Sequence, residues 1–225
     1  MDFTFIANAW PPVSDADFEG AGLGGSEAAQ VLLCRVLAGR GHRVTVFNHT
    51  YKPGNSHGGD YRNLAQLGLA VHHDVIVLVK AMLPGFAQLK ARRKLFWATD
   101  IRPSPLEREV IPHVDRVLLM STFHRTWALE HHPSISSEAL EVLDLGVHAP
   151  DYFPEPSDIV PSKAEARLIY CSMPDRGLEH LARLFPYVRA RVPAAELFIT
   201  GDFSLYRQPA GTDDYARLFS GMPGI

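Results

Sequence analysis

The chain lacks the features that mark several large classes of protein. Only two of its 225 residues are cysteines, Cys34 and Cys171, and they show no C-x-x-C spacing, so we expect two reduced, buried thiols and no disulfide framework. No apolar run approaches the ~20 residues that a transmembrane helix needs. With 22 Lys and Arg against 25 Asp and Glu, the formal net charge is −3, which provides no cationic field for binding a nucleic acid.

Motifs of many enzymes and of targeting segments are absent as well. The sequence has no H-E-x-x-H and no P-loop. Gly54 to Gly58 match G-x-S-x-G, but this segment is a loop by composition, so we expect no hydrolase nucleophile elbow. Gly20 to Gly25 match G-x-G-x-x-G, but they do not directly follow an expected strand, so we expect no dinucleotide fingerprint. A D-x-D sequence begins at Asp15, but it follows Pro-Pro-Val-Ser and not an apolar strand, so we expect no metal there. The N-terminus has neither the basic flank nor the apolar core of a signal peptide, and a cytoplasmic location is therefore predicted.

What the chain does have is a globular composition, with 46% hydrophobic and 21% charged residues, and apolar runs that alternate with helical patterns. Uninterrupted apolar runs are typical of parallel strands buried on both faces. The pattern predicts an α/β protein with a Rossmann-like, doubly wound parallel sheet. The expected strands of this sheet are Phe3 to Ala7, Val44 to Phe47, Val75 to Val79, Leu95 to Ala98 and Val117 to Met120.

Amphipathic spacing predicts the helices. The strongest pattern begins at Ser26, which is expected to cap the helix, and continues through Leu37. The segment from Gly54 to Gly59 is expected to be a flexible loop by composition. Weaker helical patterns are Leu83 to Arg92, Leu106 to His113 and Phe123 to Glu130.

A change of composition predicts two domains. Residues 149–164 contain four prolines among acidic and Ser residues, which is typical of a linker between an N-terminal domain at 1–148 and a second unit at 165–225. That unit is long enough for only two β-α repeats, so we expect a partial second Rossmann-like domain. Its expected elements are a strand at 168–171, a helix at 175–191, a strand at 197–200 and a helix at 213–219.

Three segments carry candidate binding residues. Gly24 and Gly25 precede Ser26 and Glu27 where the best helix opens, and free N–H groups there suit a phosphate or a sugar hydroxyl; a turn that only allows tight packing is the alternative. Thr99 and Asp100 end a strand at the edge where open α/β sheets bind ligands, although Asp100 is equally expected as a turn cap.

The third segment runs from Ser172 to Leu178, between the first strand and helix of the second unit. Arg176 stands where the strand gives way to the helix, and a guanidinium there can pair with a diphosphate; a surface arginine that caps the loop is the alternative.

In order and spacing, these segments resemble the GT-B glycosyltransferases, specifically the retaining group 1 (family 4) enzymes that use nucleotide sugars. The resemblance rests on Gly24 to Glu27, Gly41 to Val46, Trp97 to Asp100, Asp115 to Ser121, Val142 to Phe153 and Ser172 to Gly201. It implies an acceptor-side first domain and a donor domain that holds a nucleotide diphosphate sugar, with Arg176 on the diphosphate and no metal or other cofactor. Ser172 and Gly201 are further donor-side residues by position, and no catalytic residue is assigned.

The sequence departs from that family in four places. Thr99 replaces a frequent His, Leu145-Gly146 replaces Asn-Gly, and Cys171 or Ser172 stands where an Arg often binds diphosphate. The E-x7-E segment, which the family carries further along, would follow Ile225. We therefore expect an incomplete donor site, with activity of this chain left open. The implied partners are a nucleotide sugar and a glycan, lipid or small-molecule acceptor, with a homo-oligomer through the second unit.

Two other hypotheses remain open. One is a non-catalytic derivative of a glycosyltransferase that binds a sugar, a nucleotide or a protein. The other is an unrelated nucleotide-binding or oxidoreductase α/β protein, which is disfavoured because no G-x-G-x-x-G directly follows an expected strand.

Overall fold

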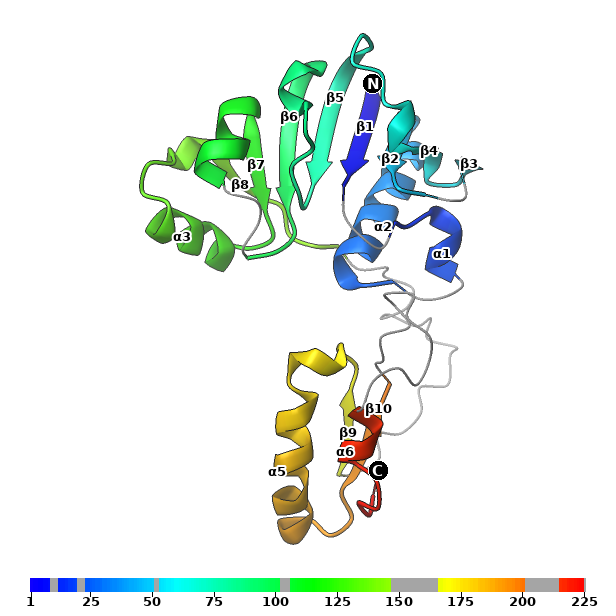
Figure 1. Cartoon of the computed structure of the whole chain (residues 1–225), viewed down its shortest axis with the longest axis vertical. Helices are drawn as coiled ribbons and strands as arrows, with labels where there is room; N and C mark the ends of the chain where they lie inside the picture. Colours follow the sequence, from blue (N-terminus) through cyan, green and yellow to red (C-terminus); the bar gives the residue numbers. More distant parts are fainter. Residues whose placement is uncertain are drawn as a thin grey trace. The chain divides into compact units, whose positions relative to one another are not determined.

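The computed structural model describes residues 1–8, 12–19, 23–50, 53–101, 106–146, 166–200 and 215–224. The chain divides into two compact units, Met1–Tyr152 and Phe153–Ile225, each of which is described by itself (Figure 1). The linker expected at 149–164 lies outside the described residues. Within the described residues, no helix combines the length and the apolar character needed to cross a membrane.

The first unit is built on a sheet of eight strands in the order β3-β4-β2-β1-β5-β6-β7-β8. Every neighbouring pair is parallel except β3 and β4, which form an antiparallel hairpin at one edge. The α/β, Rossmann-like fold predicted from the sequence is confirmed. The strands are β1 (Asp2–Ala7), β2 (Arg43–Asn48), β3 (Gly54–Ser56), β4 (Gly59–Asn63), β5 (His72–Val79), β6 (Lys90–Ala98), β7 (Arg116–Leu119) and β8 (Leu140–Val142).

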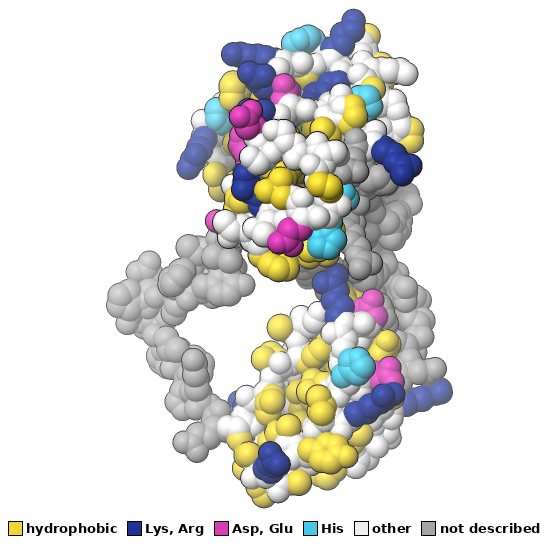
Figure 2. All heavy atoms as spheres, turned by 90° about the vertical axis from the view of Figure 1, so that its left-hand side faces the viewer, with side chains coloured by type: hydrophobic (Ala, Val, Ile, Leu, Met, Phe, Trp, Pro, Cys, Tyr) yellow, Lys and Arg dark blue, Asp and Glu magenta, His cyan; other side chains and the backbone are white. Residues whose placement is uncertain are grey.

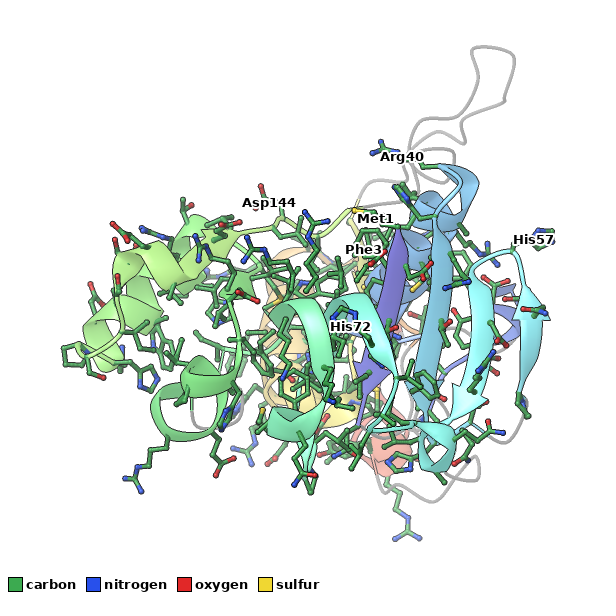
Figure 3. The ribbon with its side chains drawn as sticks, turned by 90° about the horizontal axis from the view of Figure 1, so that it is seen from above. Met1, Phe3, Arg40, His57, His72 and Asp144 are labelled. Atoms are coloured by element: carbon green, nitrogen blue, oxygen red, sulfur yellow. The ribbon has the colours of Figure 1, made fainter. Side chains whose placement is uncertain are left out.

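Helices lie on both faces of this sheet. Figure 3 looks at the sheet from above and shows α2 (Gly25–Gly39) on one side of it, with Arg40 at its end. Beneath α2 the buried core contains Phe5, Val77 and Trp97. The opposite core contains Phe96 and lies against α3 (Thr122–His131) through Ala128. The shorter helices are α1 (Asp15–Glu19), η1 (Leu64–Gln66), η2 (Phe86–Gln88), η3 (Leu106–Val110), η4 (Ile111–His113) and η5 (Ser137–Ala139).

Three local predictions for this unit are wrong. The helix expected from Leu83 is only the single turn η2, because Gly85 adopts a left-handed φ of 80° and the chain is extended again from Lys90. The loop expected from Gly54 forms the β3–β4 hairpin, which turns tightly at its centre. Ser26 is not the N-cap, since α2 begins one residue earlier with Gly24 as the cap and no capping side chain.

The second unit has two described strands, β9 (Arg167–Tyr170) and β10 (Glu196–Ile199), which are parallel. They pack against α5 (Leu178–Arg191) and α6 (Tyr215–Leu218) around a small core that includes Phe185 and Leu197. The helix expected from Asp175 is divided, because Gly177 has a φ of 107° and separates the turn η6 (Pro174–Arg176) from α5. Cys171 is exposed, contrary to expectation, whereas Cys34 is buried.

Candidate functional site

The topology of the first sheet determines where a ligand would bind. β1 pairs with β2 on one side and with β5 on the other, so the chain builds one half of the sheet and then returns to build the second half. Crevices form at the carboxyl ends of strands where the order reverses in this way. The candidate site of the first unit is therefore at the carboxyl ends of β1, β5 and β6.

Lys80 lies at the centre of this edge. It is the first residue after β5, has a φ of 69°, and its backbone N–H donates to the carbonyl of Trp97 in the adjacent strand. Its Nζ lies 3.5 Å from Oε1 of Glu27 and 3.4 Å from Oδ2 of Asp100. Burial lowers the pKa of Lys80, but the two carboxylates outweigh burial and hold this pKa above its usual value. The amine is therefore charged at neutral pH, and the three groups together carry a charge of about −1.

Gly24 and Gly25 lie at the same edge, at the N-terminus of α2. A Cβ on Gly24 would collide with the carboxylate of Glu27, so this side chain folds back against the start of the helix. A Cβ on Gly25 would meet no atom, and this residue is exposed. A carboxylate at a helix N-terminus is stabilised by the helix dipole. Glu27 thus already places a negative charge at the helix start where the sequence predicted a phosphate or a hydroxyl.

A small pocket, here called the α2 niche, opens between α2 and the strand ends. Its volume is about 20 Å³, and one water molecule needs about 10–15 Å³. Thr99 and Gln30 are each 3% exposed, and Thr99 Oγ1 and Gln30 Nε2 have no hydrogen-bond partner among the described residues. The residues that line the niche are Ala7, Pro12, Val13, Ser26, Glu27, Gln30, Asn48, Val79, Lys80 and Thr99.

Two further polar residues at this edge were missed from the sequence. Asn8 directly follows β1 and donates from Nδ2 to the carbonyl of Met82 at 3.1 Å. Its Oδ1 lies 2.9 Å from Nε2 of His49, which directly follows β2. Asn8 comes immediately after a predicted strand and His49 comes two residues after one, and this position in the sequence is the signal by which they could have been found.

His124 in the first turn of α3 is the third residue that was missed. It is 2% exposed, and neither ring nitrogen has a hydrogen-bond partner among the described residues. Burial lowers the pKa of His124, and nearby Asp100 only partly opposes this shift. The backbone N–H of His124 donates to Oγ of Ser121, the N-cap of α3. His124 is therefore a neutral imidazole at pH 7, located near the candidate site.

The D-x-D sequence has structural roles. Asp15 is buried and accepts from Nε of Arg35 at 2.6 Å. Asp17 accepts from the backbone and the hydroxyl of Ser14 at 2.7 and 2.8 Å. Among the described residues, no group of three or more His, Cys, Asp or Glu side chains is arranged to hold a metal ion.

The second unit places Arg176 at the carboxyl end of β9. Its side chain is exposed, and no ion pair forms with it among the described residues. Ser172 is half-buried in the same loop, which the hydroxyl of Tyr170 supports by donating to the carbonyl of Met173 at 2.6 Å. Gly201, the other residue expected on the donor side, lies outside the described residues.

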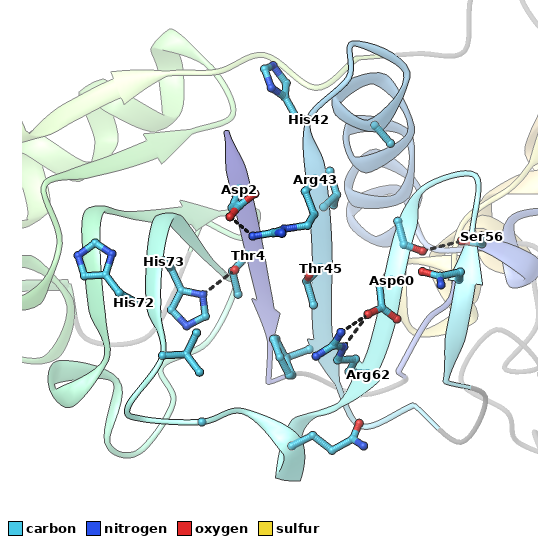
Figure 4. A pocket seen from close by; sticks show the side chains of 18 residues that line it. Asp2, Thr4, His42, Arg43, Thr45, Ser56, Asp60, Arg62, His72 and His73 are labelled. Carbon is cyan, nitrogen blue, oxygen red and sulfur yellow. Dashed lines mark hydrogen bonds and ion pairs between the residues drawn. The ribbon is translucent and has the colours of Figure 1, made fainter.

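A second hollow, of about 540 Å³, lies on the first sheet away from this edge (Figure 4). Two ion pairs line it, Asp2–Arg43 and Asp60–Arg62, so its charged groups already have partners. These residues alternate along their strands with buried apolar ones, which is the pattern of a sheet face open to water. The labelled side chains that project into it from β1, β2 and β4 are Asp2, Thr4, Arg43, Thr45, Asp60 and Arg62.

Comparisons with known proteins give a likeness of fold. No protein-family model matches the chain, and a search of curated proteins finds no match. A glycosyltransferase from Rickettsia africae ESF-5 superposes with a TM-score of 0.61 at 15% identity, over 97% of this chain and 65% of that one. The lipopolysaccharide outer core galactosyltransferase WaaB, in its apo form, gives a TM-score of 0.54 at 13% identity, over 98% and 64%.

The chain shares the fold of these two glycosyltransferases. The likeness extends over both of its units, since nearly the whole chain is covered. The chain spans about two thirds of the length of each of these neighbours.

Proposed function

We propose that this protein is a glycosyltransferase that moves a sugar from a nucleotide diphosphate sugar to an acceptor hydroxyl. The observation that carries the proposal is the likeness of fold to two glycosyltransferases over 97% and 98% of the chain. Polar residues at the carboxyl ends of the strands in both units support it, because open α/β sheets bind their ligands at that edge.

The two units take different parts of the reaction in this proposal. Asp100, Thr99 and Ser26 in the first unit contact the acceptor, because carboxylate and hydroxyl oxygens pair well with sugar hydroxyls. Arg176 and Ser172 in the second unit contact the donor diphosphate. A guanidinium that meets the charge developing on the leaving group lowers the barrier electrostatically.

The finer assignments rest on the sequence resemblance described above. They comprise the GT-B, group 1 (family 4) class, retention of the anomeric configuration, and the domain limits 1–148, 149–164 and 165–225. The cytoplasmic location and a homo-oligomer through the second unit likewise remain predictions from the sequence. We also propose that this chain alone does not sustain transfer, because the described second unit offers only the two strands β9 and β10 to hold a donor.

Calorimetric titration of the chain with UDP, GDP, ADP and their sugars tests the proposal. We expect saturable binding of one nucleotide diphosphate and, when acceptors are added, slow turnover that is not sustained. Binding of NAD or FAD in place of nucleotide diphosphates would contradict it and favour the unrelated α/β protein.

Turnover and its stereochemistry separate the remaining hypotheses. Acceptor-dependent release of nucleotide over many turnovers would contradict the incomplete donor site and would allow retention to be read from the product by NMR. Saturable nucleotide binding without any turnover, even at high enzyme concentration, would favour the non-catalytic derivative.

A further inference from the structure

We propose that the carboxyl edge of the first unit selects a neutral acceptor, one hydroxyl group of which enters the α2 niche beside Thr99, and disfavours a phosphorylated or otherwise anionic group there. This inference rests on the proposed function and names the class of acceptor that the site would take. It concerns only residues of the first unit, and so it can be tested without a nucleotide.

The first observation is the size and chemistry of the α2 niche. About 20 Å³ accommodates one hydroxyl group or one water but not a phosphate. Thr99 Oγ1 both donates and accepts hydrogen bonds, and Gln30 Nε2 donates them. Both atoms are buried without a partner among the described residues. Buried polar groups of this kind are costly unless a ligand or a water completes their hydrogen bonds.

The second observation is that the niche is reached from the surface. Three of its lining residues, Ser26, Glu27 and Lys80, are half-buried, whereas Thr99 and Gln30 are buried. A hydroxyl that enters past the half-buried residues can bond to Thr99 and Gln30 while the rest of the acceptor stays outside. Asp100, which Lys80 holds at 3.4 Å, is positioned at this edge to accept from a second hydroxyl.

The third observation is the charge. Glu27 and Asp100 together carry two negative charges against the single positive charge of Lys80. The dipole at the N-terminus of α2, which would otherwise attract an anion, already has the carboxylate of Glu27 against Gly24. An added phosphate would meet like charges within a few ångströms, whereas a neutral polyol would not. Of the two ligands that the Gly24-Gly25 segment could take, the structure therefore favours the hydroxyl.

The test is an NMR titration of the full chain, without nucleotide, with the methyl glycosides of glucose, galactose and mannose and with the 6-phosphates of these sugars. We expect at least one neutral glycoside to bind and its 6-phosphate to bind about tenfold more weakly. Thr99→Val keeps the shape of the side chain and removes the hydroxyl, so it should weaken binding of the neutral glycoside about 2- to 10-fold. Thr99→Ser should retain binding.

Matched controls separate the niche from general effects on the fold. Thr45→Val removes a hydroxyl from β2, away from the niche, and should leave glycoside binding unchanged. Glu27→Gln should reduce the preference for the neutral sugar about tenfold, whereas Glu141→Gln, which alters an exposed ion pair with Arg116 on β7, should not. Circular dichroism of each variant checks that the sheet is intact.

Three results would overturn the inference. The first is that no neutral glycoside binds. The second is that the unmodified chain binds a 6-phosphate more tightly than the corresponding neutral glycoside. The third is that the Thr99→Val variant binds the glycoside normally, which would mean that the niche holds only a water. None of them bears on nucleotide binding by the second unit. A failure of the nucleotide titration would in turn leave the glycoside measurements valid, so the two proposals can fail separately.

Discussion

The two units of this protein use related β-α patterns, but they differ in how completely their apolar side chains are buried and their charged side chains are paired. In the first unit, two buried clusters fill both faces of an eight-stranded sheet, and Lys80 is held between two carboxylates. Among the described residues of the second unit, a core of six buried residues supports two strands, and Arg176 has no ion pair.

The surface of the second unit shows the same difference. Leu184 and Tyr187 on α5 are 59% and 74% exposed, and Figure 2 shows hydrophobic side chains gathered on the face of this unit that α5 forms. Ile169 and Phe198 are also exposed, at 66% and 46%, one on each strand of the two-stranded sheet. The first unit therefore has an edge whose charged groups are already paired, whereas the second has Arg176, with which no ion pair forms among the described residues.

The largest expected effect concerns the cores. Phe96 in β6 is 0% exposed, whereas Phe198 in β10 is 46% exposed. Phe96→Ala should lower the free energy of unfolding of the first unit by ~3–5 kcal/mol, because it removes a ring from a packed core. Phe198→Ala should cost ~1 kcal/mol or less. Urea titration measures both, since tryptophan fluorescence reports the first unit and circular dichroism reports both units. Equal losses of unfolding free energy in the two variants would mean that Phe198 on β10 is buried in the folded protein.

The next effect concerns Arg176, with which no ion pair forms among the described residues. Arg176→Ala should weaken binding of a nucleotide diphosphate by ~1.5–3 kcal/mol, because a charged hydrogen bond is lost. Arg183→Ala is the matched control, since Arg183 is exposed on α5 and already paired with Glu179. Titration calorimetry gives both affinities. Unchanged affinity in Arg176→Ala, with measurable binding by the unmodified chain, would remove Arg176 from the donor site.

Acid should destabilise the first unit selectively. Burial lowers the pKa of His124, and the pKa of His73 is lowered by burial and by neighbouring His72. Because the unfolded chain binds protons more tightly at these groups, the stability they provide is present above about pH 6.5 and is lost as the pH falls toward the folded pKa values. The loss is at most ~1.4 kcal/mol per pH unit for each group.

The measurement is the urea midpoint of tryptophan fluorescence between pH 7.5 and 5, together with the circular dichroism transition of the second unit, whose His180 is exposed. His124→Leu should flatten the pH dependence of the first unit. If the urea midpoint of this variant depended on pH as strongly as that of the unmodified chain, burial of His124 would not be the cause of the pH dependence.

The smallest expected effect is the difference in stability between alanine variants of Gly24 and Gly25 in the first unit. A Cβ on Gly24 would push the carboxylate of Glu27 away from the start of α2, so Gly24→Ala should cost up to ~1 kcal/mol through the dipole and the Lys80 pair. Gly25→Ala meets no atom and should stabilise the helix by up to ~1 kcal/mol. Thermal unfolding compares the two variants. A loss of stability in Gly25→Ala would contradict the open space around this residue and would indicate that the added methyl group collides with another atom.

Much of the fold could be predicted from the sequence, because central parallel strands are buried on both faces and leave continuous apolar runs. Val75–Val79 and Leu95–Ala98 were found in this way, although β5 and β6 begin earlier, where polar residues stand at the strand ends. The hairpin of β3 and β4 and the short edge strand β8 were missed, because edge strands are only partly buried and carry no such run.

The candidate site could be predicted only in part. The positions of Gly24 and Asp100 at the ligand edge follow from the sequence alone, because each comes next after a strand or opens a helix. Tertiary structure was needed to bring Lys80 to Glu27, 53 residues away in the chain, and to bury Thr99 and Gln30 in one niche. The sequence determines which groups stand at the ends of the elements. Pairing and desolvation depend on distances across the sheet, so only the folded chain decides that Glu27, Lys80 and Asp100 come together as a group with a net negative charge.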